Sequence, residues 1–226
     1  SAAECREDVL PFLDDDAQAA RDWSMRLLGA YADDDVLGVG GRIVPRFEAG
    51  RPQWLPPEFD WVIGCTYEGH RSSLGPVRNL IGANMSMRRR VFDSVGGFRA
   101  DLGRTGSKPS GCEETELCIR ATRELGGVMW YQPDALVYHF VPSSRTTRAY
   151  FRQRCYAEGQ SKATISQVTG RQRGLASERA FVTGALPRAV AREVSSAVTT
   201  RKPKSWSRAG FVGLGAATTA LGYLQG

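Results

Sequence analysis

The chain has 226 residues, 42% of them hydrophobic, which is enough for one domain of ordinary size plus an appended segment. Its five cysteines are an odd number without a C-x-x-C pair, which excludes a disulfide framework or a zinc ribbon and indicates a reducing compartment. The net charge of +6 is unevenly distributed, because residues 141–226 carry 14 Lys/Arg against 3 Asp/Glu. This basic part is the one that would meet anionic lipid or nucleic acid.

Strand-like and helix-like segments mix without strict alternation, which predicts an α/β fold with a mixed sheet. We expect strands over residues 9–13, 36–44, 61–67, 81–87, 128–131 and 135–140. We expect helices over residues 17–31, 88–96, 111–125 and 145–161. Pro133-Asp134 predicts a turn between the last two strands. Pro11 is unusual for a central strand, and a solvated loop is expected at Asp33-Asp34-Asp35.

The first apolar strand ends in Asp14-Asp15-Asp16. Carboxylates at the end of a strand suit Mg²⁺ or Mn²⁺, which prefer oxygen ligands and are commonly held together with substrate phosphates. The alternative is a turn or a helix N-cap, where aspartate is also favoured. Adjacent charges repel unless a cation or donor compensates them, which favours the metal interpretation.

Acidic residues also crowd the start of the helix expected over residues 111–125. Glu113, Glu114 and Glu116 suit a helix N-terminus, which is positive, and this is the structural alternative. The functional alternative is that Glu114 acts as a general base, because its neighbour Glu113 would raise its pKa. No Ser-His-Asp or Cys-His spacing indicates covalent catalysis.

His139 ends an apolar run far downstream. It is either a hydrogen-bonded residue at the edge of the core or a ligand, since neutral imidazole binds transition metals. A site that mixes carboxylate and imidazole would favour Mn²⁺ over Mg²⁺.

A basic segment follows, in which Arg145, Arg148 and Arg152 would share one helix face. Together with Arg154 they are either a solvated surface or a contact for a phosphorylated acceptor or anionic headgroups. Beyond it we expect a second unit over residues 163–226, after a first unit over 1–162. Within it, the basic run from Arg201 to Arg208 leads into an uncharged stretch.

That stretch, with Trp206, predicts an interfacial helix over residues 205–226 rather than a membrane span. A helix packed on the domain is the alternative. Nucleic-acid binding is not expected, because the tail lacks interleaved aromatic residues and any recognisable motif.

Taken in order, these features resemble family-2 glycosyltransferases. The series that carries the resemblance is the strand into Asp14-Asp15-Asp16, then Gly40-Gly41, Gly82-Ala83-Asn84-Met85-Ser86, Gly96-Gly97-Phe98, Glu113-Glu114-Thr115-Glu116-Leu117, Pro133-Asp134-Ala135 and His139. The resemblance implies a GT-A-type fold and inverting transfer from a nucleoside-diphosphate sugar, with Mn²⁺ or Mg²⁺ as cofactor.

It also implies roles for single residues. Asp14 and Asp16 match the family's DxD motif, with Asp15 between them, and Asp16 is the better candidate for direct metal ligation. Glu114 falls where the family carries its catalytic base, usually an aspartate, and Glu113 fills the preceding acidic position. Asn84 matches a residue near the donor sugar, and His139 matches a position that ligates metal in some relatives.

Family members normally begin with strand-helix units that hold the nucleoside, and here only about eight residues precede the first strand. We therefore expect an N-terminally truncated enzyme, or alternatively a non-catalytic remnant that binds a sugar or a nucleotide sugar. The stretch over residues 61–67 resembles enzymes that act on lipid-linked sugars such as polyprenyl or dolichyl phosphate glycans. This resemblance predicts a glycan or lipid-linked acceptor, and the basic tail with its interfacial helix predicts peripheral contact with the cytoplasmic face of the cell membrane.

Overall fold

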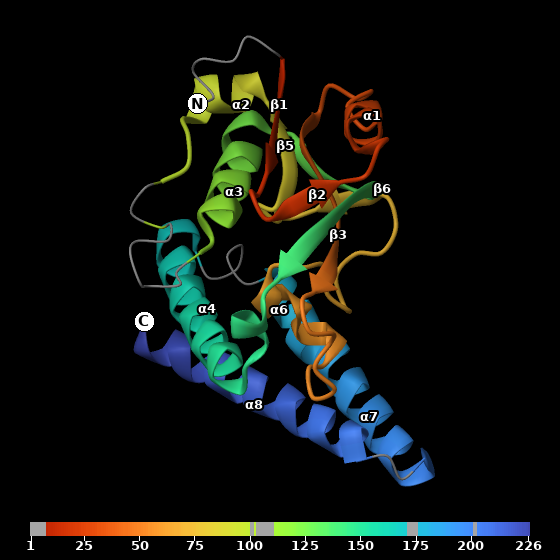
Figure 1. Cartoon of the computed structure of the whole chain (residues 1–226). Coiled ribbons are helices and arrows are strands. Elements are labelled where there is room, and N and C mark those ends of the chain that lie inside the picture. The colour runs from red at the N-terminus through yellow and green to blue at the C-terminus, as the bar shows by residue number, and fades with distance from the viewer. Residues whose placement is uncertain (1–7, 100–101, 103–110, 171–175, 201–202) are drawn as a thin grey trace.

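The computed structural model describes residues 8–99, 102, 111–170, 176–200 and 203–226 (Figure 1). A β-sheet with helices against it forms the upper part of this view, and a layer of long helices forms the lower part. The described cysteines, at positions 65, 112, 118 and 155, are free and buried.

The sheet has six strands within the described residues. They are β1 (Val9–Leu13), β2 (Ala17–Ala19), β3 (Val36–Phe47), β4 (Gly75–Val77), β5 (Asn84–Arg88) and β6 (Val128–Val141). Five of them lie in the order β1-β5-β3-β6-β2, and β4 also pairs with β6. β3 and β6 are parallel and the other pairs antiparallel, which confirms the predicted α/β class with a mixed sheet.

β1 lies at an edge of this sheet, which explains how it accommodates a proline. Pro11 lies opposite Ser86 of β5, the strand with which β1 pairs in the described sheet. Proline lacks a backbone N–H and is tolerated where one side of a strand faces away from the ladder. The strand predicted over residues 9–13 is confirmed with these bounds.

β6 is one continuous strand where two were predicted. Between Gly41 and Arg42 of β3 the pairing skips residues 133–135, which bulge out of the ladder. A bulge absorbs a proline without ending the strand. The predicted turn at Pro133-Asp134 is therefore wrong.

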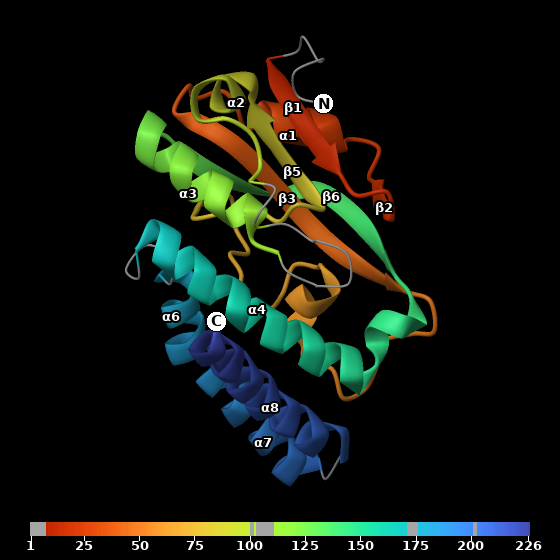
Figure 2. The ribbon, with the colours of Figure 1, turned by 90° about the vertical axis from the view of Figure 1, so that its left-hand side faces the viewer.

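The α-helices are α1 (Trp23–Gly29), α2 (Arg89–Val95), α3 (Glu113–Leu125), α4 (Arg148–Thr169), α6 (Ala176–Ala180), α7 (Leu186–Thr200) and α8 (Pro203–Gln225). Shorter helical turns are η1 (Pro57–Ile63), η2 (Ser143–Thr146) and the π-helical η3 (Phe181–Ala185). Figure 2 shows α3 beside the sheet, then α4, then α7 and α8.

The elements predicted over residues 17–31 and 61–67 are also wrong, in part or entirely. Residues 17–31 are not one helix, because β2 pairs with β6 and α1 begins only at Trp23. Residues 61–67 are not a strand, because η1 extends to Ile63 and Gly64 ends it with a φ of 78°. A short apolar run does not distinguish a buried strand from a buried helix, and here Pro57 occupies the first position of η1, where proline favours a helical start.

The C-terminal region is helical, as predicted, and it shares a core with the sheet-bearing part. Phe59 and Phe151 pack in the same buried cluster as Leu186 and Val212 of the last two helices. The expected division at residue 162 falls inside α4 and stays a prediction. In the described part of the chain, no helix has both the length and the hydropathy that crossing a bilayer requires.

α4 and α8 approach closely at two glycines. A Cβ on Gly159 of α4 would collide with the Thr219 carbonyl oxygen of α8, and a Cβ on Gly222 would collide with that of Tyr156. The backbones therefore pack without intervening side chains.

This contact generates a matched pair of substitutions. We expect Gly159→Ala to lower the free energy of unfolding by about 1–3 kcal/mol, because α8 must move away from α4. Gly210→Ala, where a Cβ meets no atom within 4 Å, should raise it by up to about 1 kcal/mol through helix propensity. Urea denaturation followed by circular dichroism measures both, and equal shifts would contradict the close packing.

Candidate active site

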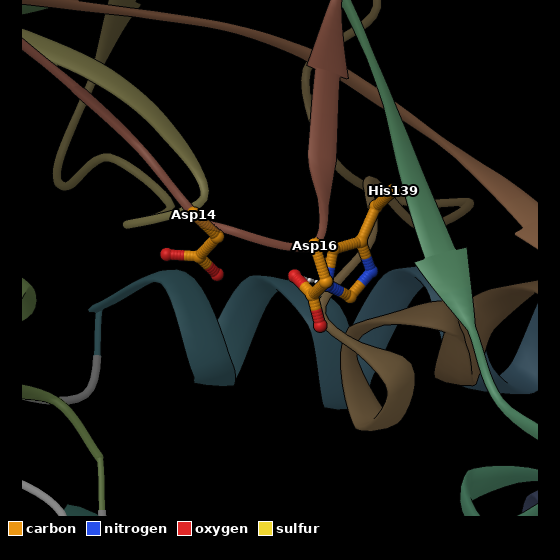
Figure 3. Close-up of side chains that lie close together, drawn as sticks. All are labelled: Asp14, Asp16 and His139. Atoms are coloured by element: carbon orange, nitrogen blue, oxygen red, sulfur yellow. Dashed lines mark ion pairs between the residues drawn. The ribbon is translucent and has the colours of Figure 1, made fainter.

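Asp14, Asp16 and His139 form a cluster whose ligand atoms all lie within 4.8 Å of one another (Figure 3). The two aspartates come from the turn between β1 and β2, and His139 comes from β6. Strand pairing creates the cluster, because Ala17 of β2 lies opposite His139 and the Phe140 amide donates to the Asp16 carbonyl at 2.9 Å.

The imidazole of His139 is held firmly. It is 2% exposed, its Nε2 lies 2.9 Å from Asp16 Oδ1, and its Nδ1 lies 3.7 Å from Cys65 Sγ. Gly64 packs against the ring, so that a Cβ there would lie 3.2 Å from Cε1. A fixed imidazole beside two carboxylates is a donor set that suits Mn²⁺.

A cation of the protein already occupies part of this cluster. Arg145 of η2 places Nη1 3.2 Å from Asp16 Oδ2, so both oxygens of Asp16 have protein partners.

The prediction of one helix from residue 145 is wrong at its start. Thr147, in extended backbone, separates η2 from α4 and accepts a hydrogen bond from the Tyr150 amide at 3.1 Å.

The cluster opens on a cavity of about 220 Å³. Asp14, Asp15, Asp16 and His139 line it, and η1 with its C-cap Gly64, η2 and α4 contribute the other lining residues: Trp61, Val62, Ile63, Gly64, Arg145, Tyr150 and Arg154. Sequence reasoning missed Trp61 and Tyr150, because it placed Trp61 in a strand and treated the region of Tyr150 only as a basic face.

The three arginines predicted to contact an acceptor do not lie together. Arg154 is buried and lines the cavity. Arg148 and Arg152 are exposed and are not among its lining residues, and the Arg148 guanidinium lies over the Phe211 ring of α8 at 5.6 Å. The acceptor role of all three stays a prediction.

Glu114 lies in the first turn of α3, just after Cys112, whose φ of 86° turns the chain into the helix. Burial raises the pKa of this carboxyl to about 7, and the charges of Glu113 and Asp14 add to the rise. A Cβ on Gly82 would collide with Glu114 Oε1, so the carboxylate rests on the backbone at that glycine. Glu114 therefore lies within electrostatic reach of the aspartate turn.

The other two acids of this helix differ from each other. Glu116 is 2% exposed and pairs with Arg120 at 2.8 Å, which makes it part of the helix packing. Glu113 has a buried Oε2 without a hydrogen-bond partner among the described residues. A buried acceptor left in this state favours a ligand that donates to it.

Asn84 is fully buried and bonds to the protein itself. Its Nδ2 donates to the Ala135 carbonyl in the β6 bulge at 2.8 Å and to the Arg42 carbonyl at 3.1 Å, and its Oδ1 accepts from Trp23 Nε1 at 2.7 Å. These bonds tie the bulge to β3 and α1. The donor-binding role that the resemblance implies for Asn84 stays a prediction.

Comparison with known proteins gives two curated relatives. The chain is 36% identical over 159 residues to the glucosyl-dolichyl phosphate glucuronosyltransferase of Haloferax volcanii, which covers 70% of this chain and 51% of that protein. It is 26% identical over 160 residues to the succinoglycan biosynthesis protein ExoM of Rhizobium meliloti, covering 70% and 48%. The chain thus spans about half the length of the curated relatives it matches.

Among solved structures, GalNAc-T7 with UDP, GalNAc and Mn²⁺ matches with a TM-score of 0.44 and 15% identity. That match covers 89% of this chain and 43% of GalNAc-T7. Residues 1–96 match the sequence profile of the family described as Glycosyl transferase family 2. This matched segment contains the aspartate turn and Asn84.

Proposed function

We propose that this chain forms the reaction centre of an inverting glycosyltransferase, which moves a sugar from a nucleoside-diphosphate sugar to a hydroxyl of a lipid-linked glycan. The observation that carries the proposal is that the charge of Asp14, a member of the Asp14, Asp16 and His139 cluster, contributes to the raised pKa of Glu114. The cluster supplies ligands for a cation that a diphosphate requires, and Glu114 supplies a carboxylate suited to proton transfer. The match of residues 1–96 to glycosyl transferase family 2 supports the same reaction class.

Asp14, Asp16 and His139 would hold the metal, because two carboxylate oxygens and one imidazole nitrogen fit Mn²⁺ or Mg²⁺, with preference for Mn²⁺. When bound, the metal supplies Lewis-acid stabilisation of the negative charge on the leaving diphosphate. Asp16 and Asp14 would hold the diphosphate end of the donor only with that metal bound, because bare carboxylates repel phosphate oxygens. His139, fixed in the core, keeps the cluster in one geometry.

Glu114 accepts the proton of the acceptor hydroxyl as that oxygen attacks the anomeric carbon on the face opposite the diphosphate. Attack from the opposite face inverts the configuration at that carbon. A carboxyl with a pKa of about 7 is poised for this role, because it is ionised in a large fraction of molecules at neutral pH and holds the transferred proton well. Glu113 raises the basicity of Glu114 through its charge.

The acceptor side of the cavity offers recognition for a phosphorylated sugar. Trp61 and Tyr150 are aromatic, Arg154 is cationic, and all three line the same cavity as the aspartates. Aromatic faces bind the apolar faces of sugar rings, and guanidinium groups bind phosphate oxygens. The name of the Haloferax volcanii relative specifies a dolichyl phosphate substrate, which supports a lipid-linked acceptor here.

α8 provides a surface for the membrane that would contain such an acceptor. Its exposed large apolar side chains are Trp206, Leu214, Leu221 and Leu224, and their spacing places them along one stripe of the helix. No charged residue occurs from Ala209 to the end of the chain, while Lys204 and Arg208 lie at the start of the helix. An apolar stripe with a basic end favours peripheral contact with anionic headgroups.

The first test concerns the metal ligands and uses Arg145. We expect Arg145→Gln to tighten Mn²⁺ binding about 3–10-fold, because Asp16 Oδ2 loses its competing partner. Titration calorimetry without nucleotide measures the affinity. Arg152→Gln removes the same charge from an exposed position outside the cavity and should change the affinity less. Equal effects of the two substitutions would show that only net charge matters.

The second test concerns the base. In the complete protein, Glu114→Gln should lower kcat by about 10²–10⁴-fold, because the amide cannot accept the proton. Glu124→Gln, at the exposed end of the same helix, should leave kcat unchanged. Near-normal turnover of the Glu114 variant would remove this residue from the role of base.

The pH dependence tests the same residue in the unmodified enzyme. The base must be unprotonated, so kcat/KM should fall tenfold per pH unit below the Glu114 pKa of about 7 and level off above it. This acidic limb should be absent from the Glu114→Gln variant.

Titration of a nucleoside diphosphate with and without Mn²⁺ separates an enzyme from a binding remnant, since the proposed site requires the metal for tight binding.

The third test concerns the membrane. The chain should cosediment with vesicles of phosphatidylcholine and phosphatidylglycerol and be released by high salt. Leu224→Glu should weaken binding about 10-fold, since one buried leucine is worth ~1.5 kcal/mol. Met25→Glu, at a comparably exposed site on α1, is the control. Binding that is equal for both variants would argue against α8 as the contact.

A further inference from the structure

We propose that Glu178 of α6, in the helical tail, is a positioning residue for the base Glu114. This inference rests on the proposed function. It concerns a chain of buried contacts that begins beneath Glu114, passes through the tail, and returns to the start of α3. Glu178 joins the two halves of that chain of contacts, because it pairs with Arg78 in one half and with Lys162 in the other.

The first half of the contacts starts under the carboxylate. Glu114 rests on Gly82, in the segment between β4 and β5. This segment begins at Arg78, whose guanidinium forms a two-point pair with Glu178: Nη1 lies 2.6 Å from Oε2 and Nη2 lies 2.8 Å from Oε1. Bidentate pairs of this kind fix both partners in orientation as well as distance. Glu178 therefore holds one end of the segment that supports Glu114.

The second half runs along α4. Glu178 Oε1 also lies 2.8 Å from Lys162 Nζ, and Lys162 lies 3.2 Å from Glu158 Oε1. Cys112, the residue that turns the chain into α3, places Sγ 3.8 Å from the same Glu158 oxygen. The Gly111 amide donates to Ser161 Oγ of α4 at 3.4 Å. α4 therefore contacts the two residues that precede Glu113 and Glu114.

Four charged residues in this chain of contacts, which we call the Glu178 ring, are shielded from water. The side chains of Lys162, Arg78, Glu158 and Glu178 are 11%, 15%, 19% and 27% exposed. Although burial opposes it, Lys162 and Arg78 hold the pKa of Glu178 at about 2, so this carboxylate is charged at neutral pH. Loss of one charge in a shielded group leaves the opposite charges around it less compensated and makes them rearrange. Such a rearrangement would move both the segment at Gly82, on which Glu114 rests, and the start of α3, which carries Glu114.

The tail also contains an ion pair that serves as a matched control. Arg192 of α7 lies 2.6 Å from Glu68, whose side chain is 54% exposed. This pair joins the same tail to the sheet-bearing part. Arg192 and Glu68 are absent from the contacts of the Glu178 ring. A general role of tail attachment would make the two pairs equivalent.

The experiment measures kcat and nucleoside-diphosphate affinity in the complete protein for Glu178→Gln, Glu178→Asp and Glu68→Gln. We expect Glu178→Gln to lower kcat about 10-fold while affinity in the presence of Mn²⁺ is unchanged, because displacement of a catalytic group by a fraction of an ångström is costly. Glu178→Asp, which keeps the charge, should recover part of the loss. Glu68→Gln should behave as the unmodified protein.

A double variant tests whether Glu178 acts through Glu114. Once Glu114 is glutamine, the addition of Glu178→Gln should lower kcat no further, because the positioned group is gone. Multiplicative losses, normal turnover of Glu178→Gln, or a Glu178 variant that also loses nucleotide binding would each overturn the inference. The proposed function fails separately, if Glu114→Gln alone leaves turnover normal.

Discussion

The pairing of β2 with β6 fixes the geometry of the candidate site. β2 has only three residues, yet it places Asp16 beside His139 because Ala17 lies directly opposite that histidine. A slip of one residue would turn the imidazole to the other face of the sheet. The bulge at residues 133–135 sets the register on the other side of β6, and Asn84 ties that bulge to β3. The cluster thus depends on backbone pairing more than on any single side-chain bond.

Negative charge is concentrated in this region at a cost in stability. Asp14 and Glu113 both raise the pKa of Glu114, which means that each makes its ionised form less favourable. Because the folded pKa lies above the usual carboxyl value, this group destabilises the fold progressively as pH rises from about 4.5 to 7. Such an arrangement is typical of a functional site, since packing alone would select against it. Arg145 offsets part of this charge at Asp16.

The sequence predicted the elements that depend on local chemistry. The apolar run before the aspartates predicted β1, and the acids before Leu117 predicted the start of α3. Prediction from the sequence failed for elements whose structure is determined by contacts between distant parts of the chain. Residues 61–67 are apolar because η1 is buried from several sides, and Pro133 is accommodated by a bulge that only the β3 partner reveals.

The candidate site shows the same division between what local sequence predicts and what only tertiary contacts reveal. Asp14, Asp16 and His139 were predicted as metal ligands from their residue types and from the resemblance, and the structure brings them together. Their roles as ligands, and that of Glu114 as base, remain proposals. Trp61, Tyr150 and Arg145 were not predicted to line one cavity with the aspartates, since their neighbours there come from distant parts of the chain.

The helical tail is best understood as part of the reaction unit. Val212 of α8 and Leu186 of α7 lie in one core with Phe59 of η1, two residues before Trp61 in the cavity wall. Glu178 joins α4 to the segment beneath Glu114 across 100 residues of sequence. The face of α8 that carries the apolar stripe is therefore mechanically linked to the cavity wall and to the base through α4. A helix layer that rests on a membrane would in this way set the height and orientation of the cavity relative to a lipid-linked acceptor.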